Sequence, residues 1–325
     1  MSKDFQSLSL RNPICYFMMS ALNKIPVVLV GVTSGLGYSI AKALVANSKL
    51  CVTLFTRSSE ANPLLEPLIK GGATIKQVDY TSIDTLTSAL RGIHTVISTI
   101  SPADLTPTRN LLKAVIAAGV KRFVPSEFAY GEETNAEFDV YNNKKELWEE
   151  VRASGLEYTA FRNGIFLDYF AAGASVKYEE APLRIFPALL DIGAEKNELP
   201  RTGEEKITFT SVRDIGEFVS AAILLEKWPE ELGMAGETTT LNQIVRDAEE
   251  IVGRKFEVTY VPTEELRKRA DELGATGDTM GKTRCQIGAA LGEGRGEIKP
   301  YLNEVTDVKP IGVKEFLKKY WGTRA

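Results

Sequence analysis

Three side chains near the middle of the chain have the types and the spacing that acid–base chemistry requires. Tyr141, Lys144 and Lys145 lie in the stretch DVYNNKKELWEEVRAS, residues 139–154, which predicts a helix. Side chains three or four positions apart share a helix face, so Tyr141 is expected to face one of the two lysines. His94 is the only histidine, which argues against a Ser-His-Asp triad and against a multi-histidine metal site. Acid–base chemistry near neutral pH must then depend on a lysine, a tyrosine or a carboxylate.

A glycine-rich turn upstream has the pattern of a phosphate-binding site. Residues 25–44, IPVVLVGVTSGLGYSIAKAL, begin with an apolar run, continue through three glycines and then change to helical spacing. A strand, a glycine turn and a helix in this order direct backbone N–H groups and the positive end of a helix dipole toward a phosphate. The residues expected to contact it are Gly31, Thr33, Ser34, Gly35, Leu36 and Gly37.

The end of the second predicted strand, residues 50–56, carries a residue that would distinguish NADP from NAD. In a dinucleotide-binding fold this position meets the adenosine ribose, where an acid favours NAD and a basic residue accommodates the 2′-phosphate of NADP. The sequence has Arg57 there, followed by two serines. NADP(H) is therefore the expected cofactor. Ser98 and Thr99, at the end of the strand predicted over residues 94–100, are expected beside it.

Strands and helices alternate along the first half of the chain. Further strands are predicted over residues 73–78, 122–124 and 158–162, and helices over residues 38–46, 82–90 and 108–118. This alternation predicts an α/β fold with a doubly wound parallel sheet, the Rossmann architecture.

The predicted organisation has three parts. They are an N-terminal extension over residues 1–23, an NADP-binding Rossmann domain over 24–164, and a smaller, more irregular substrate lobe over 165–325. Residues 206–225 of that lobe are expected to pack back on the Rossmann domain. The glycine-rich stretch 274–296 gives no clear pattern.

Composition limits the classes of partner. The 325 residues carry 39 Lys and Arg against 43 Asp and Glu, a net charge of −4, without a dense basic run, so nucleic acid is not expected. Three unpatterned cysteines give no reason to expect a metal site. No apolar run reaches the roughly 18 to 20 residues of a membrane span, and the first residues lack a proper signal peptide. A cytoplasmic protein without membrane contact is expected, and the sequence allows a homodimer.

Four features of the chain occur together in one known group. They are GVTSGLG at residues 31–37, VKRFVPSEF at 120–128, Lys144 placed eleven residues before a helix-ending glycine, and TSVRDIG at 210–216. This combination resembles the isoflavone reductase-like and NmrA-like atypical short-chain dehydrogenases. The resemblance implies a reductase in which Arg57 selects NADP(H), and Lys144 binds the nicotinamide ribose and acts as general acid–base.

Two catalytic arrangements remain open. Tyr141 and Lys145 have the YxxxK spacing of ordinary short-chain dehydrogenases, in which the lysine lowers the tyrosine pKa so that the phenol exchanges a proton with a carbonyl oxygen. The distance to Gly155 favours Lys144 instead. Trp148 stands where the plant phenolic reductases often have an arginine.

The expected function is NADPH-dependent reduction of a carbonyl, enone or quinone methide in a small aromatic or terpenoid metabolite. Phe128, Phe166 and Phe170 are expected to line an aromatic substrate pocket, and Glu127 is either a site carboxylate or a structural residue. One alternative is a dehydrogenase that uses the Tyr141–Lys145 pair. The other, from a different class, is a non-enzymatic NADP-sensing regulator, since some NmrA-like proteins have that role.

Overall fold

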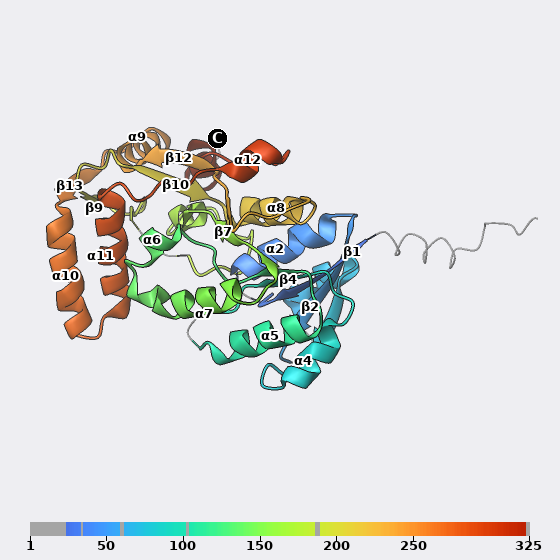
Figure 1. The fold of residues 1–325 in the computed structure, drawn as a ribbon. Helices are drawn as coiled ribbons and strands as arrows, with labels where there is room; N and C mark the ends of the chain where they lie inside the picture. The colour runs from blue at the N-terminus through green and yellow to red at the C-terminus, as the bar shows by residue number, and fades with distance from the viewer. Residues whose placement is uncertain (1–23, 34, 59–61, 102–103, 186–188, 323–325) are drawn as a thin grey trace, which may run out of the picture.

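The computed structural model describes residues 24–33, 35–58, 62–101, 104–185 and 189–322. Ser34 and the extension expected over residues 1–23 lie outside these ranges. The described chain forms a large parallel sheet with helices on both faces, and a smaller lobe built mainly by the last third of the sequence (Figure 1).

The central sheet has six parallel strands in the order β3-β2-β1-β4-β5-β6. The strands are β1 (Ile25–Val30), β2 (Leu50–Thr56), β3 (Thr74–Gln77), β4 (Thr95–Ser98), β5 (Arg122–Val124) and β6 (Glu157–Tyr158). The strand order reverses between β1 and β4, and open α/β sheets bind ligands outside the carboxyl ends of the strands at such a point. This topology confirms the predicted Rossmann fold.

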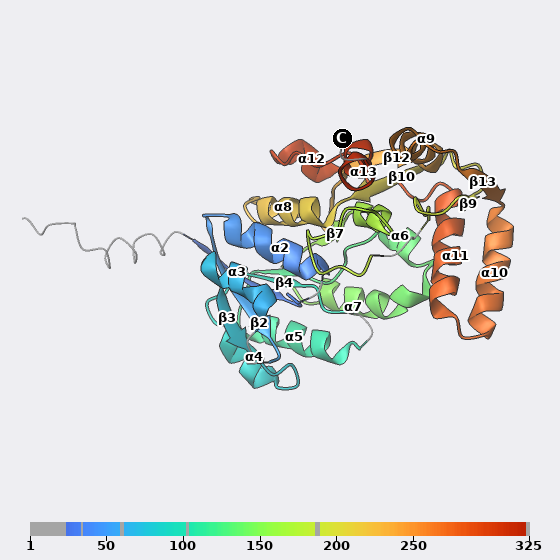
Figure 2. The same cartoon turned by 180° about the vertical axis from the view of Figure 1, so that it is seen from behind.

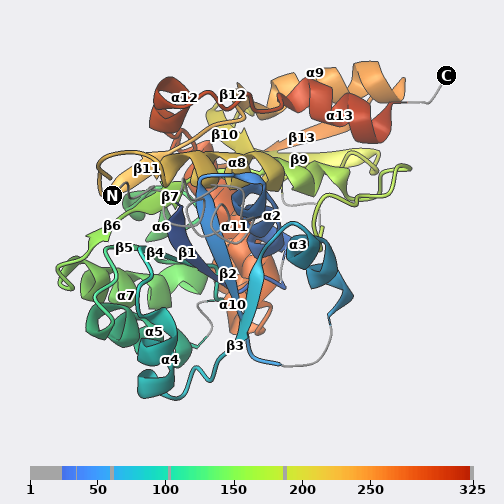
Figure 3. The ribbon, with the colours of Figure 1, turned by 90° about the vertical axis from the view of Figure 1, so that its right-hand side faces the viewer.

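The apolar run of β1 is buried because helices cover both faces of the sheet. Val27 and Leu29 pack into the core on one face, and Val28 and Val30 pack into the core on the other. The first face is covered by α2 (Gly35–Ala46), with α3 (Glu66–Lys70) beside it, and by α8 (Val212–Ala222) (Figure 3). The second face is covered by α4 (Ile83–Leu90), α5 (Thr106–Ala117) and α7 (Asn142–Arg152) (Figure 3).

Helix α8 comes late in the sequence but packs directly on α2. The two backbones approach so closely that a Cβ atom at Gly216 would lie 2.7 Å from the carbonyl oxygen of Ser39. The amide of Asn47 donates a hydrogen bond to the Ser220 hydroxyl at 3.1 Å across the same contact. The range 206–225 is thus divided, because α8 covers the large sheet whereas β10 (Lys206–Thr210) belongs to the lobe.

The smaller lobe consists of three short sheets and a set of helices. Strand β10 is the central strand between β8 (Ile165–Phe166) and β12 (Glu237–Thr240). Two parallel pairs join β7 (Ala160–Arg162) to β11 (Glu231–Gly233) and β9 (Lys196–Pro200) to β13 (Glu257–Val261). The helices are α6 (Glu132–Asn135), α9 (Leu241–Val252), α10 (Thr263–Ala275), α11 (Thr279–Gly292), α12 (Tyr301–Val305) and α13 (Val313–Trp321). The pair α10 and α11 stands side by side at the end of the lobe (Figures 1 and 2).

Two predicted elements differ from the structure near the expected site. The stretch 139–154 begins with a 3₁₀ turn, η2 (Asp139–Tyr141), so Tyr141 has the non-helical torsion angles φ −104° and ψ 4° and only α7 is α-helical. The strand predicted over 158–162 divides at Thr159, which is fully buried. Residues before the break pair with β5, and the Ala160 amide after it donates a hydrogen bond to Glu230 at 2.9 Å.

Candidate active site

The glycine turn after β1 is held against the end of β4. The Thr99 hydroxyl donates hydrogen bonds to the carbonyl oxygens of Val30 at 2.8 Å and Gly31 at 3.1 Å. Gly31 has a φ of +90°, and a Cβ atom there would lie 2.6 Å from the Thr99 hydroxyl oxygen. A Cβ atom at Gly37 would meet the Gly31 carbonyl oxygen, so glycine is required at both positions. A larger residue at Gly37 would therefore disturb the turn itself.

A cleft of about 590 Å³ opens over this turn and the ends of β1, β2 and β4. Of the residues expected to hold the cofactor, Gly31, Thr33, Arg57 and Thr99 line the cleft. Arg57 is exposed there, and its guanidinium makes no ion pair with any described residue. A glycine-rich turn with hydroxyls nearby and a cation beyond them fits the phosphates and the ribose phosphate of NADP(H).

Five other expected cofactor residues within the described chain do not line this cleft: Gly35, Leu36, Gly37, Ser98 and Lys144. Ser98 is fully buried, and its hydroxyl accepts a hydrogen bond from the Ile100 amide at 3.4 Å. Leu36 packs against the core between α2 and the sheet. At Gly35 a Cβ atom would lie 2.6 Å from the Leu183 Cβ atom, so a segment of the substrate lobe crosses the start of α2. No pattern in the sequence predicts that crossing.

Lys144 and Lys145 have opposite environments although they are adjacent. The Lys144 side chain is buried, and its Nζ lies 4.3 Å from the ring centre of Tyr141. Among the described residues no hydrogen bond or ion pair is made by that ammonium group. Lys145 is exposed at the rim of the same cavity. The structure thus places Lys144, and not Lys145, against Tyr141.

Burial and nearby charges set the proton affinity of this pair. Burial lowers the pKa of Lys144, the charge of Glu127 opposes that shift, and the charge of Arg162 adds to it. Burial and, to a lesser extent, Glu127 raise the pKa of Tyr141 to about 12. The tyrosine therefore keeps its proton, while the lysine gives up its proton more readily than an exposed lysine.

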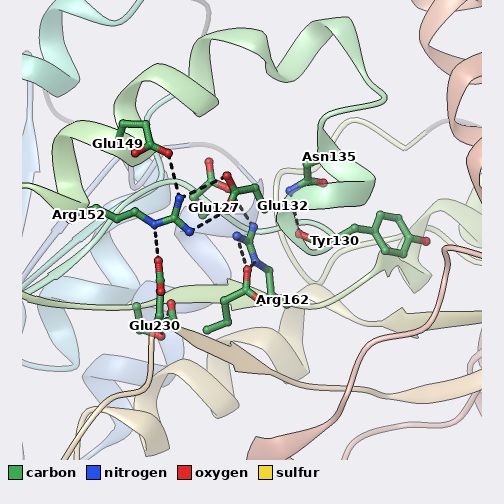
Figure 4. A network of polar contacts seen from close by, with 10 residues as sticks. Glu127, Tyr130, Glu132, Asn135, Glu149, Arg152, Arg162 and Glu230 are labelled. Carbon is green, nitrogen blue, oxygen red and sulfur yellow. Dashed lines mark hydrogen bonds and ion pairs between the residues drawn. The ribbon is translucent and has the colours of Figure 1, made fainter.

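Lys144 opens on a cavity of about 310 Å³ that is bordered by a network of ion pairs. Nη1 of Arg162 lies 2.9 Å from Oε2 of Glu127, and both side chains are buried (Figure 4). Arg162 also contacts Glu231 at 2.8 Å. Arg152 contacts the carboxylates of Glu132, Glu149 and Glu230 (Figure 4). Glu127 is therefore an ion-paired carboxylate at the edge of the lysine cavity.

Tyr141 also borders a second, mainly aromatic cavity of about 240 Å³. Phe128 and Phe166, two of the three phenylalanines expected at a substrate pocket, line this cavity. Phe170 does not, because it packs in the lobe core with its ring centre 5.3 Å from that of Phe209. The other aromatic lining residues are Tyr130, Phe138 and Tyr169.

The outer wall of the aromatic cavity comes from α11. This helix contributes Met280, Thr283, Arg284 and Ile287. Sequence reasoning missed these residues, because α11 lies in the glycine-rich stretch 274–296. Helix α11 packs against α10, and this packing positions a helix that its weak sequence pattern does not predict.

Two other kinds of site are absent from the described residues. No group of three or more His, Cys, Asp or Glu side chains within them is placed to hold a metal ion. No helix within them is both long enough and apolar enough to cross a membrane.

Comparisons with known proteins agree with this architecture. Oxidoreductase BOA1 of Botryotinia fuckeliana is 29% identical over 240 residues, which cover 71% of this chain and 77% of that protein. Phenylcoumaran benzylic ether reductase IRL1 of Ginkgo biloba is 25% identical over 322 residues, covering 92% and 100%. Among solved structures, the binary complex of leucoanthocyanidin reductase with NADPH from Vitis vinifera superimposes with a TM-score of 0.72 at 18% identity, covering 91% of this chain and 99% of that one.

A model of the NmrA-like family matches residues 23–291. That range includes the glycine turn, Lys144 and the whole central sheet. The match confirms the resemblance found in the sequence, and the chain belongs to the NmrA-like family.

Proposed function

We propose that this protein is an NADPH-dependent reductase of a small aromatic or terpenoid metabolite, with Lys144 as general acid. The observation that carries the proposal is the buried Lys144 amine, which has no hydrogen-bond partner in the described chain and lies against Tyr141. Tyr141 in turn borders the aromatic cavity. Three relatives or structural neighbours that are named as an oxidoreductase or as reductases support the same class.

The cofactor site of the proposal is the cleft over the glycine turn. Backbone N–H groups of the turn would hold the pyrophosphate, and Arg57 would contact the 2′-phosphate. Ser34 belongs to the same proposed set but lies outside the described residues. Bound NADPH supplies the hydride that is added to an electrophilic carbon of the substrate.

Lys144 would supply the proton that completes the reduction. As hydride reaches the carbon, negative charge develops on the substrate oxygen, and a positioned ammonium group stabilises that charge and then donates its proton. The lowered pKa of Lys144 favours this transfer near neutral pH. Phe128, Phe166 and Tyr141 would hold an apolar ring beside the amine.

The test compares two adjacent lysines. Purified protein is incubated with NADPH and a panel of phenolic and terpenoid ketones, enones and quinone methides, and NADPH oxidation is followed. Lys144→Met should lower turnover roughly a hundredfold, the usual scale for a positioned proton donor, while NADPH still binds. Lys145→Met is the matched control and should keep most of the activity, because that side chain is exposed.

Other outcomes would select the alternatives. Loss of activity in Lys145→Met and Tyr141→Phe, with an active Lys144→Met, would assign the reaction to the tyrosine–lysine pair of ordinary short-chain dehydrogenases. Tight NADPH binding without turnover of any panel member would favour a regulator that senses NADP. Equal activity of all three variants would remove this region from proton transfer.

A further inference from the structure

We propose that Arg162 is a positioning residue that keeps the Lys144 amine free by holding Glu127 in an ion pair. The inference rests on the proposed role of Lys144. Lys144 is a buried cation without an ion-pair partner in the described chain. Glu127, the carboxylate whose charge raises the pKa of Lys144, is instead paired with Arg162.

Arg162 is fixed in this position by the backbone as well as by its side chain. The break in the strand at Thr159 transfers the chain to β7, which pairs with β11 and brings Arg162 beside Glu231. A β-bridge joins Arg162 to Ala129, two residues beyond Glu127, and the Asn163 amide donates to the Ala129 carbonyl at 2.9 Å. The strand that carries the guanidinium is thereby tied to the loop that carries the carboxylate.

The Arg162–Glu127 pair is deeply buried. The side chains are 3% and 7% exposed, and their closest atoms are 2.9 Å apart. The guanidinium also faces the Trp148 ring at 5.7 Å from its centre. A guanidinium that is paired with two carboxylates and faces an aromatic ring has little freedom to turn toward the lysine cavity.

The other charges around Lys144 are also occupied or solvated. Glu132, from α6, lines the same cavity but is paired with Arg152 at 2.8 Å. Glu133 and Lys145 lie at the cavity edge and are exposed. No described carboxylate lies within ion-pair distance of Lys144, whose ammonium instead faces the Tyr141 ring.

Removing Arg162 should change this distribution. Glu127 would be left as a buried carboxylate without its cation, which is unfavourable. Of the two lysines that line its cavity, Lys144 is the buried one. The lysine would lose the repulsion of Arg162 and gain an ion pair, and both changes favour its charged form. An amine tied to Glu127 would hold its proton more tightly and would point away from a substrate oxygen.

The experiment measures Lys144 directly. The full chain is labelled with acetic anhydride over a series of pH values. The peptide that contains both lysines is released by a protease that does not cut at lysine, and is quantified by mass spectrometry. Lys145, next in sequence and exposed, is the internal reference for reagent reactivity. The variants are Arg162→Gln, Glu127→Gln and the double variant. Arg109→Gln is the control, because Arg109 pairs with Glu146 and Glu150, also on α7.

Arg162→Gln should raise the labelling midpoint of Lys144 by at least one pH unit, a tenfold tighter hold on the proton. Glu127→Gln should lower the midpoint, and the double variant should return it to the wild-type value or below. Arg109→Gln should leave it unchanged. A folded Arg162→Gln protein with the wild-type midpoint would overturn the inference. If Arg162→Gln does not fold, Glu127→Gln decides, and an unchanged midpoint there would overturn it equally.

Activity separates this inference from the proposed function. If Lys144 is the acid, the alkaline limb of the kcat profile should move with the labelling midpoint in each variant. If the labelling midpoint moves but the alkaline limb of the kcat profile does not, Arg162 still controls the pKa of Lys144. Lys144 would then not be the proton donor. A merely structural role of Arg162 would lower stability without moving either pH value.

Discussion

Arg57 provides the residue-scale test of the cofactor site. A guanidinium contact to a phosphate contributes about 1–3 kcal/mol, as charge-assisted hydrogen bonds do. Arg57→Asp should therefore weaken NADPH binding roughly tenfold to a hundredfold, as measured by fluorescence titration. NADH, which lacks the 2′-phosphate, is the control ligand and should lose much less affinity. Wild-type protein that binds NADH as tightly as NADPH would contradict the assignment.

The environment of each side chain shows which lysine faces Tyr141, a question that sequence spacing leaves open. The spacing alone places Tyr141 near either lysine. The structure distinguishes them, because Lys144 is buried against the tyrosine ring and Lys145 is exposed. The spacing fails at Phe170, which directly follows the cavity-lining Tyr169 but packs in the core of the lobe. Which face of a short 3₁₀ turn points inward depends on the lobe around it, and adjacent residues do not reveal it.

At the scale of elements, the contact between α2 and α8 depends on Gly216. A methyl group there would lie 2.7 Å from a backbone carbonyl of α2, and a backbone cannot move aside as a flexible side chain can. Gly216→Ala should lower the free energy of unfolding by roughly 1–3 kcal/mol through overpacking. Urea unfolding measures this change.

A second helical glycine supplies the control for that prediction. At Gly288, within α11, the nearest atom to an added Cβ is the end of the Leu266 side chain at 3.3 Å, which can rotate. Gly288→Ala should be close to neutral, or should stabilise the protein through the better helix propensity of alanine. Equal destabilisation of Gly216→Ala and Gly288→Ala would show that the close approach of α2 and α8 does not make an added methyl group more costly than in another helix.

Elements were predictable where local pattern and tertiary environment agree. The strands at residues 50–56 and 122–124 have their predicted bounds, because short apolar or β-branched runs are buried in sheets. The break at Thr159 could not be predicted. It depends on pairing with β11, some seventy residues later in the chain. The α11 wall of the aromatic cavity was missed for the same reason, since its glycine-rich sequence carries little helical pattern and its support comes from α10.

At the scale of the whole molecule, Asp168 joins parts of the chain that are distant in sequence. This carboxyl lies in η3 (Leu167–Ala171) and is 1% exposed. The Tyr178 hydroxyl donates to one of its oxygens at 2.6 Å, and the Val212 amide, at the start of α8, donates to the other at 2.8 Å. The Tyr178 ring in turn packs 5.7 Å from the ring of Tyr320 in α13. One buried carboxyl thus connects the lobe to the helix that covers the large sheet.

The ionisation of Asp168 should make stability depend on pH. Burial raises the pKa of Asp168 to about 6, aided by the charge of Asp214 and opposed by these two hydrogen bonds and by one from its own backbone. The folded state then binds the proton more tightly than the unfolded state, whose carboxyl titrates near pH 4, so this group's contribution to stability falls as pH rises from about 4 to about 6. Two pKa units correspond to about 3 kcal/mol, which is the upper scale of the effect.

Asp168→Asn tests this dependence because the amide does not titrate. Urea unfolding of both proteins between pH 4 and pH 7 should show the wild type losing stability relative to the variant as pH rises, by up to about 3 kcal/mol. The absolute stability of the variant also reflects the changed hydrogen bonds, so the difference in slope is the quantity to compare. Asp271→Asn, at an exposed aspartate, is the control and should follow the wild-type slope. Parallel curves for Asp168→Asn and the wild type would mean that folding does not raise the pKa of Asp168, and that the lobe and α8 are joined by a carboxylate that is ionised over most of this range.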